Sequence, residues 1–257
     1  MEPPTFISSH RNPHFKRWLS LLDSKGVKRH HQCIISGEKI TKSLLQDPNV
    51  LIHSIILSPF HPENIETFSD FPCYTLNRAL FQDLDIFGTH SPLLICDVPA
   101  LPTASLTKAP SGLEVICPVG DPGNLGTILR SCLAFGAQKI ILPQEAVHPF
   151  HPKVIRASSG AVFSLRLEQT GALSTLNSPQ SLRWVTALDL QGKDLEEWEW
   201  QPQTRLLIGE EGTGIPSFSY QSRLCISQYD SSIPLNAAVA VSIACHAYHQ
   251  HFPSHRE

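Results

Sequence analysis

Apolar residues alternate along this chain between short continuous runs and longer stretches with helical spacing. In the first part of the chain, the runs 34–35, 52–57, 74–76 and 93–95 predict strands. The stretches 13–22, 38–45 and 78–86 predict helices, and the acid-rich residues 62–72 predict a loop or a helix. This alternation of strands and helices predicts a small α/β domain at residues 1–98.

The same alternation resumes after residues 99–112, whose three prolines and several Ser and Thr residues predict a linker. Strands are predicted at 113–119, 139–142, 163–167, 183–188 and 206–208. Apolar residues at i, i+3, i+4, i+7 and i+8 predict a helix over 125–133, with Asn124 as its N-cap and Gly136 ending it. We therefore expect a second α/β domain at residues 113–257.

A glycine-rich acidic turn follows the last of these strands. Residues 209–214 read G-E-E-G-T-G, and residues 233–236 open a further helix that is apolar almost all round. A strand, a glycine-rich turn and a buried helix are how an α/β protein frames a small-molecule pocket at the carboxyl ends of its strands. The carboxylates favour a ligand with hydroxyl or amine groups over phosphate.

The composition is that of a soluble globular protein, with 41% hydrophobic and 17% charged residues among 257. No apolar run is long enough to cross a membrane, and the N-terminus lacks the pattern of a signal peptide. The seven cysteines form no CxxC pair, and several lie inside apolar runs. They predict reduced, buried thiols in a cytoplasmic protein.

Positive charge is concentrated near the N-terminus, although the formal net charge is −3. Residues 10–31 contain six Lys and Arg residues, among them Arg11 and Lys16, against one acid. Such a segment is typical of a nucleic-acid-binding face and equally of a solvated helix surface. The segment that contains Lys153 and Arg156 also has two interpretations. It could bind phosphate or ribose, or it could be a short helix that Gly160 ends.

Several common site motifs are absent. Residues 120–126 read GxxGxxG, which is not the dinucleotide-binding GxGxxG, and no Walker lysine is present. Ser158-Ser159-Gly160 lacks the GxSxG pattern of a hydrolase. His246 and His249 have no acid or second cysteine at ligand spacing, so no metal site is predicted.

Four segments, in order, resemble the SpoU/TrmH branch of the SPOUT RNA ribose 2′-O-methyltransferases. Residues 124–136 resemble its N-x-G-x-x-x-R…G element, and residues 152–161 resemble P-K-x-x-R-A-S-x-G-A. Residues 207–214 resemble G-x-E-G-x-G, and residues 226–245 resemble I-P-M…S-L-N-x-S-V-A. Residues 1–98 resemble, less specifically, the family's ribosomal-protein-like RNA-binding domain through Asn12, Lys16 and Gly37-Glu38.

The resemblance implies a parallel-sheet domain with a C-terminal trefoil knot, working as a homodimer. It implies S-adenosylmethionine as cofactor, held near Leu207, Gly209, Ile226 and Leu235. Asn124, Arg130, Glu211 and Asn236 match its catalytic positions. For Arg130 the spacing alone also fits a surface arginine.

The resemblance implies an RNA substrate, more readily ribosomal RNA than transfer RNA because of the N-terminal domain. The chain departs from the family pattern at three places: Pro234 and Ala238 replace serines, and Ser227-Gln228 replaces P-M. Pro234 removes a hydroxyl and a backbone N–H. A non-catalytic RNA-binding or ribosome-assembly protein on the same fold therefore stays open as an alternative.

Overall fold

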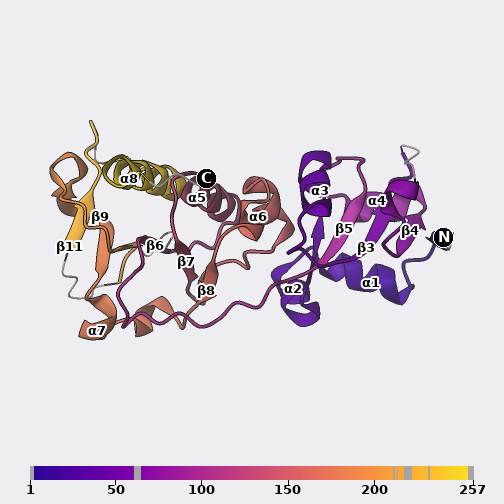
Figure 1. The fold of residues 1–257 in the computed structure, drawn as a ribbon, viewed down its shortest axis with the longest axis horizontal. Helices are drawn as coiled ribbons and strands as arrows, with labels where there is room; N and C mark the ends of the chain where they lie inside the picture. The colour runs from indigo at the N-terminus through magenta and orange to yellow at the C-terminus, as the bar shows by residue number, and fades with distance from the viewer. Residues whose placement is uncertain are drawn as a thin grey trace. The chain divides into compact units, whose positions relative to one another are not determined.

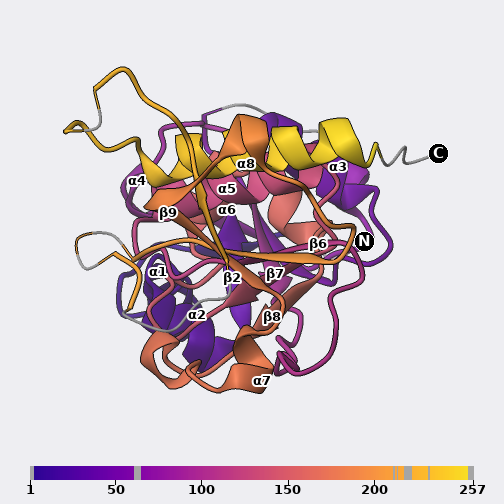
Figure 2. The same cartoon turned by 90° about the vertical axis from the view of Figure 1, so that its left-hand side faces the viewer.

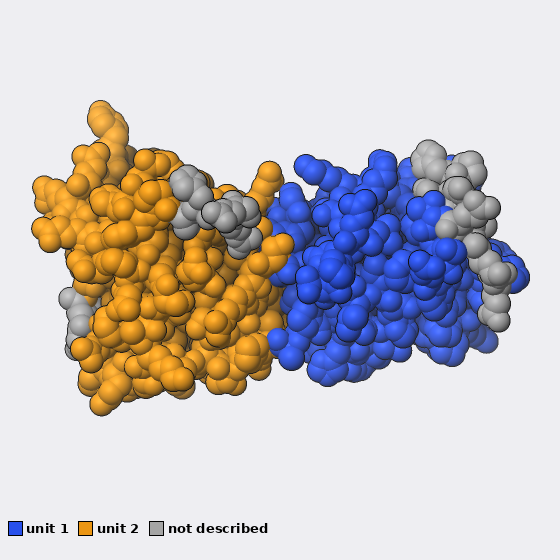
Figure 3. Space-filling model, viewed as in Figure 1, with its two compact units in different colours: residues 1–100, 150–163 blue, residues 101–149, 164–257 orange. Residues whose placement is uncertain are grey.

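The computed structural model describes residues 3–60, 65–210, 212, 214–216, 222–230 and 232–253. The chain forms two compact units (Figure 3). Unit 1 contains residues 1–100 and 150–163, and unit 2 contains residues 101–149 and 164–257. The sequence predicts two domains that follow one another along the chain, and it gives no indication that residues 150–163 group with unit 1.

Unit 1 is built on a five-stranded mixed sheet with the order β1-β4-β3-β5-β2 (Figure 1). Strand β5 runs antiparallel to β2 and β3, and the remaining pairs are parallel. The strands are β1 (Thr5–Ile7), β2 (Gln32–Ile35), β3 (Ile52–Leu57), β4 (Cys73–Leu76) and β5 (Leu93–Asp97). The helices are α1 (Pro13–Ser20), α2 (Ser24–His30), α3 (Glu38–Leu45), α4 (Arg78–Leu84) and α6 (Pro152–Ala157), with 3-10 turns at Ile65–Phe68 and Ala161–Phe163.

The core of unit 1 forms where the apolar face of α1 meets the sheet. Phe15 and Trp18 are fully buried, and they belong to one cluster with Phe81 of α4 and Ile95 of β5. Asn12 begins α1, because its side chain accepts hydrogen bonds from the backbone N–H groups of the first turn. The helical spacing read from residues 13–22 therefore predicts this helix correctly.

Unit 2 is built on a six-stranded parallel sheet with the order β11-β9-β10-β6-β7-β8. The strands are β6 (Leu113–Ile116), β7 (Lys139–Leu142), β8 (Leu167–Gln169), β9 (Val185–Asp194), β10 (Thr204–Leu207) and β11 (Ser222–Cys225). The helices are α5 (Pro122–Ala134), α7 (Pro179–Leu182) and α8 (Ala237–His251), with 3-10 turns at Leu173–Thr175 and Leu195–Glu197. Helices α5 and α8 lie side by side (Figures 1 and 2).

The strand order places a topological switch at the middle of this sheet. From β6 the chain moves outward to β7 and then β8, whereas β10 and β9 lie on the other side of β6. In parallel α/β sheets, ligands bind in the crevice outside the carboxyl ends of the strands at such a switch. The knot implied by the resemblance stays a prediction.

Strand β9 contains a large irregularity. Its residues Ala187 and Lys193 pair with consecutive residues of β11, Arg223 and Leu224. Residues 188–192 therefore bulge out of the ladder between these partners. Gly192 lies in this bulge, where an added Cβ would approach the backbone of Leu224 to 2.5 Å, so only glycine fits.

A buried ionic network links four strands of the same sheet. Glu114 of β6 accepts hydrogen bonds from Arg205 of β10 and pairs with Lys139 of β7 at 3.3 Å. Lys139 also pairs with Glu168 of β8 at 3.1 Å. Arg205 donates as well to the carbonyl of Leu106 at 2.8 Å, which ties the linker segment to the sheet.

The sequence predictions differ from the structure at several places. The N-cap of α5 is Asp121 and not Asn124, because the Asp121 carboxylate accepts from the Asn124 N–H and Pro122 occupies the first turn. The strand expected at 163–167 begins only at Leu167. Strands β1 and β11 were not predicted. The end of α5 near Gly136, which has φ +76°, is confirmed.

All seven cysteines are free thiols, and five of them are buried. Burial raises the pKa of Cys96 to about 12, so this thiol stays protonated. The described residues include no group of three or more His, Cys, Asp or Glu side chains arranged to hold a metal. Within the described part of the chain, we find no helix with the length and apolar character needed to span a bilayer.

Candidate active site

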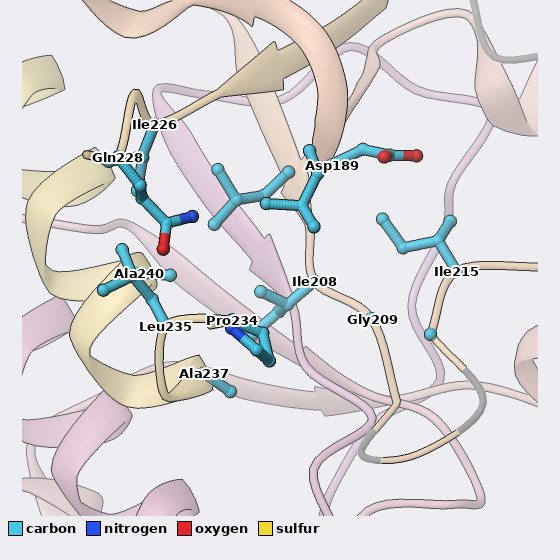
Figure 4. Close-up of a pocket in the computed structure, with 13 residues that line it drawn as sticks. Asp189, Ile208, Gly209, Ile215, Ile226, Gln228, Pro234, Leu235, Ala237 and Ala240 are labelled. Carbon is cyan, nitrogen blue, oxygen red and sulfur yellow. The ribbon is translucent and has the colours of Figure 1, made fainter. Parts of the chain in front are cut away.

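A pocket of about 330 Å³ opens at the carboxyl ends of β10 and β11 (Figure 4). Its wall is formed by segments from four parts of unit 2. They are the β9 bulge (Leu188, Asp189, Leu190), the turn after β10 (Ile208, Gly209, Gly214, Ile215), the segment after β11 (Ile226, Gln228) and the start of α8 (Pro234, Leu235, Ala237, Ala240). The pocket therefore lies on the β9, β10 and β11 side of the switch in strand order, and it is formed by the strand, glycine-rich turn and helix from which the sequence predicts a pocket.

The turn after β10 has a close backbone approach that favours glycine. The backbone of Glu210 exchanges two hydrogen bonds with that of Gly214, each 2.9 Å long. This brings Gly214 so near that a Cβ at Gly209 would lie 3.0 Å from its carbonyl carbon. Gly214 itself has φ +72°, a conformation that L side chains rarely adopt. The spacing of glycines in the sequence thus has a direct geometric cause.

The lining is mostly apolar, with two polar side chains that sequence reasoning did not identify. The Gln228 amide points toward the pocket beside Leu235 and Ala240 (Figure 4). Asp189 pairs with Arg223 at 3.0 Å. Gln228 stands two residues after Ile226, at a position where the family pattern has an apolar methionine. This replacement was the feature of the sequence that could have identified Gln228 as a pocket residue. No sequence pattern could have identified Asp189, because it lines the pocket only as a result of the β9 bulge.

The segment after β11 is fastened to the end of β9. The Ser227 hydroxyl donates to the carboxylate of Asp194. This hydrogen bond lowers the pKa of Asp194, because it favours the ionised form. Ser227 thereby holds its neighbours Ile226 and Gln228 against the pocket.

Three of the four residues expected to hold a cofactor lie on the pocket wall. They are Gly209, Ile226 and Leu235. Leu207 is absent from the described lining, since it is a residue of β10 with 1% exposure that packs in the core of the sheet. It supports the wall from behind.

Two of the residues expected to act in catalysis are in direct contact. The Asn236 Nδ2 group donates to Asn124 Oδ1 at 2.9 Å, across 112 residues of sequence. Asn236 also caps α8, because its Oδ1 accepts from the N–H groups of Ala238 and Val239. The contact joins α5 to α8, and a hydrogen bond of 2.7 Å between Ser131 and Ser242 joins them again.

The other two residues expected in catalysis are not joined to this pair. Arg130 lies on the exposed face of α5, away from the buried stripe as its spacing predicts, and it makes no hydrogen bond or ion pair with a described residue. It follows Asn124 by six residues, about 9 Å along the helix axis. Glu211 lies outside the described residues.

The residues expected to bind RNA are all exposed and all belong to unit 1. Arg11, Lys16 and Lys153 carry solvated side chains. The Arg156 guanidinium lies over the ring of Phe87, 5.4 Å from its centroid. Arg156 also comes so close to Gly37 that an added Cβ there would lie 2.7 Å from Nη1. Arg156 therefore has a packing role within unit 1.

Comparisons of the sequence and of the structure with known proteins agree with one another. Residues 114–246 match the model of the SpoU rRNA Methylase family. The chain is 34% identical over 244 residues to the ribosomal RNA small subunit methyltransferase G 2 of Syntrophobacter fumaroxidans. This match covers 94% of the chain but 48% of that relative, so the chain spans about half of the relative's length.

A second relative matches over nearly its whole length. The 23S rRNA (guanosine(2553)-2′-O)-methyltransferase RlmP of Bacillus subtilis is 27% identical over 244 residues, with 92% of this chain and 96% of the relative covered. Among solved structures, an AdoMet-bound rRNA methyltransferase from Sinorhizobium meliloti superposes with a TM-score of 0.79. It is 22% identical, and the superposition covers 97% of this chain and 99% of that one, which is a likeness of fold.

Proposed function

Because the chain belongs to the SpoU rRNA methylase family, we propose that it transfers a methyl group from S-adenosylmethionine to a ribose 2′-hydroxyl of ribosomal RNA. The observation that carries this proposal is the pocket at the carboxyl ends of β10 and β11, beside the bonded pair Asn124 and Asn236. The Bacillus subtilis relative is a 23S rRNA guanosine 2′-O-methyltransferase, which supports the reaction type.

The pocket residues fit S-adenosylmethionine. The volume lies within the range of about 300–1,000 Å³ that is usual for small-molecule sites. Apolar side chains such as Ile226 and Leu235 offer the flat, dry surface that a purine ring requires, and Gln228 offers hydrogen bonds to a ring edge. When bound, this cofactor supplies a methyl group on a positively charged sulfur.

The residues of the chain then position the nucleophile. Methyl transfer to a hydroxyl is an in-line displacement, so fixing the two reactants supplies much of the rate. The Asn124–Asn236 pair, in which Asn236 stands next in the chain to the lining residues Leu235 and Ala237, sets the hydrogen-bond geometry beside the pocket. Arg130 holds the phosphate beside the target ribose and stabilises the developing alkoxide, since a guanidinium is a poor base but a good hydrogen-bond donor. Glu211 orients Arg130 or assists in removing the proton.

A homodimer completes the proposal. Exposed apolar side chains cluster on the start of α8 and the segment before it: Tyr229, Ile233, Leu235 and Val239. Neighbouring Leu190 of the β9 bulge is exposed as well. Contiguous exposed apolar residues of this kind mark interaction surfaces. A second copy of the chain on this face would bury them beside the pocket.

The test of this function is the variant Arg130→Ala. Methyl transfer from labelled S-adenosylmethionine to ribosomal RNA should fall by at least about 100-fold, the effect of removing one stabilising donor of developing charge. Binding of S-adenosylmethionine, measured by calorimetry, should be unchanged, because Arg130 is not among the described lining residues. Arg130→Lys is the matched variant: it keeps the charge but loses the planar fork, so intermediate activity is expected. Full activity of Arg130→Ala would remove this residue from the mechanism.

A second candidate function is RNA binding without catalysis, and Pro234 favours it. Pro234 lies on the pocket wall, where it offers neither a hydroxyl nor a backbone N–H. Calorimetry with S-adenosylmethionine separates the two candidates. Binding together with methyl transfer supports the enzyme, and the absence of binding supports the RNA-binding protein.

A further inference from the structure

A second pocket, of about 590 Å³, lies at the opposite edge of the sheet in unit 2. Its lining includes Thr186, Thr204 and Ser222, which stand at or next to the first residues of β9, β10 and β11. Because these strands are parallel, their amino ends lie away from the pocket that contains Gly209. The proposed reaction makes no use of this second pocket.

Tryptophan is concentrated around this pocket. The chain has four tryptophans, and three of them lie between residues 184 and 200. Trp184 and Trp198 line the pocket and are only half-buried, so part of each indole is accessible. Trp198 packs edge-on against Trp200, which packs edge-on against Tyr248 of α8. This packing holds the Trp198 ring in place, which lowers the entropic cost of stacking a ligand on it.

The polar groups of the lining match the edges of nucleobases. Gln203 supplies a side-chain amide that both donates and accepts hydrogen bonds. The Thr186 and Ser222 hydroxyls bond each other at 3.0 Å, and the Gln201 amide donates to the Glu199 carbonyl. No hydrogen bond joins the Gln203 side-chain amide to another described residue. Arg183, whose guanidinium lies 5.0 Å from the centre of the Trp184 ring, is the one cation among the described lining residues, and no carboxylate is among them.

The charges around the pocket decide what kind of ligand fits. Glu196, Glu197 and Glu199 flank Trp198 and are exposed. Three carboxylates beside the pocket repel a run of phosphodiester backbone, while one arginine in the lining accommodates a single phosphate. A base that has left its stack presents an aromatic face and a hydrogen-bonding edge, and proteins bind such bases by stacking on aromatic side chains.

We propose that this pocket receives a single unstacked base of the RNA substrate, stacked on Trp198 and hydrogen-bonded along its edge by Gln203. The proposal rests on RNA as the substrate of the proposed function. The pocket would hold RNA at a point remote from the methyl-transfer site and so contribute to the choice of target.

The test measures binding of fluorescein-labelled single-stranded A12 RNA by anisotropy. Trp198→Ala should weaken binding by about 5- to 150-fold, the effect of losing one base–aromatic stack. Trp198→Phe should retain most of the affinity, because a phenyl ring still stacks. Gln203→Ala should weaken binding by about 2- to 10-fold, the effect of losing one hydrogen bond. Because Gln203 is exposed, this substitution should not disturb folding. Glu199→Ala, at the neighbouring exposed position, serves as the control and should not weaken binding.

Two further probes identify what the pocket recognises. A 12-mer with abasic sugars should bind wild type and Trp198→Ala equally, because it offers phosphates but no bases. Free AMP should bind about 10-fold more weakly than A12, because any of the twelve bases of A12 can occupy the pocket whereas AMP offers one. AMP binding as tight as A12 binding would assign the pocket to a free nucleotide and overturn the proposal.

The proposal is also overturned if Trp198→Ala and Gln203→Ala both bind A12 like wild type. The experiments distinguish failure of the base-pocket proposal from failure of the proposed methyltransferase function. S-adenosylmethionine binding and methyl transfer report on the first pocket. Suppose that the wild-type chain methylates no RNA and that Trp198→Ala nevertheless binds A12 more weakly than wild type does. The proposal of a base pocket would then stand, and the proposed methyltransferase activity would be rejected.

Discussion

At the scale of single residues, Asn236 carries two tasks. Its oxygen caps α8, and its amide nitrogen donates to Asn124 of α5. The orientation of the amide is set by the cap, which requires an acceptor, so the nitrogen is left to face Asn124. One side chain therefore couples the stability of α8 to the geometry of the proposed active site.

We expect Asn236→Ala to lower the free energy of unfolding by about 0.5–2 kcal/mol, the usual effect of losing a cap, and to impair methyl transfer. Asn77→Ala is the matched control, because Asn77 caps α4 in unit 1 by accepting from the Leu80 N–H. It should cost similar stability and leave methyl transfer intact. Thermal unfolding and methyl-transfer assays measure the two effects. Equal activity of the two variants would show that Asn236 acts only as a cap.

Sequence reasoning selected Asn124 for its residue type and position but assigned it the wrong local task. Asp121 precedes Pro122, and an acid directly before a proline at the first helical turn is the stronger N-cap signal. Once Asp121 caps α5, the Asn124 side chain is left to bond Asn236. That partner lies 112 residues away, and no local pattern could have revealed it.

At the scale of elements, the strands that local sequence failed to predict are those defined by their neighbours. Strand β11 has the sequence S-R-L-C, with little apolar alternation, and it is a strand because it pairs with β9. The β9 bulge likewise depends on a register shift between Arg223 and Leu224. Long, strongly periodic segments such as α5 needed no such information, and their positions were confirmed.

The ionic network across β6, β7, β8 and β10 offers a test at the same scale. Glu114→Ala should lower the free energy of unfolding by about 3–5 kcal/mol, because Arg205, only 1% exposed, would be left buried without its carboxylate. Glu38→Ala is the control, since it breaks the exposed pair with Lys42 and should cost far less stability than Glu114→Ala. Urea denaturation measures both. A loss below about 1 kcal/mol for Glu114→Ala would show that water or repacking compensates Arg205.

At the scale of the whole molecule, the proposed homodimer depends on the apolar face at the start of α8. Val239→Glu places a charge on a side chain that is 46% exposed there, and it should convert a dimer to a monomer in analytical ultracentrifugation. Leu51→Glu is the control, because Leu51 is 66% exposed in unit 1 and its replacement should leave the dimer intact. A wild-type chain that sediments as a monomer would refute the homodimer.

The family and most of the elements, though not β1 and β11, were within reach of the sequence, since they follow from short motifs and local patterns. The family model matches residues 114–246, which contain the four segments that carry the resemblance. The set of residues that forms each unit could not be predicted from the sequence. Residues 150–163 group with unit 1 because α6 packs against β2, a contact between distant parts of the chain.

The pairing of β6 with β10 has a consequence for how the chain is made. Glu114 and Arg205 face each other across 91 residues of sequence. At about 5–20 residues per second, a ribosome needs roughly 5–20 s to synthesise that interval. Throughout it, the edge of β6 with its apolar residues Val115 and Ile116 has no partner, and Glu114 has no arginine. Unpaired apolar edges recruit other strands, so this interval is when a nascent chain most needs a chaperone.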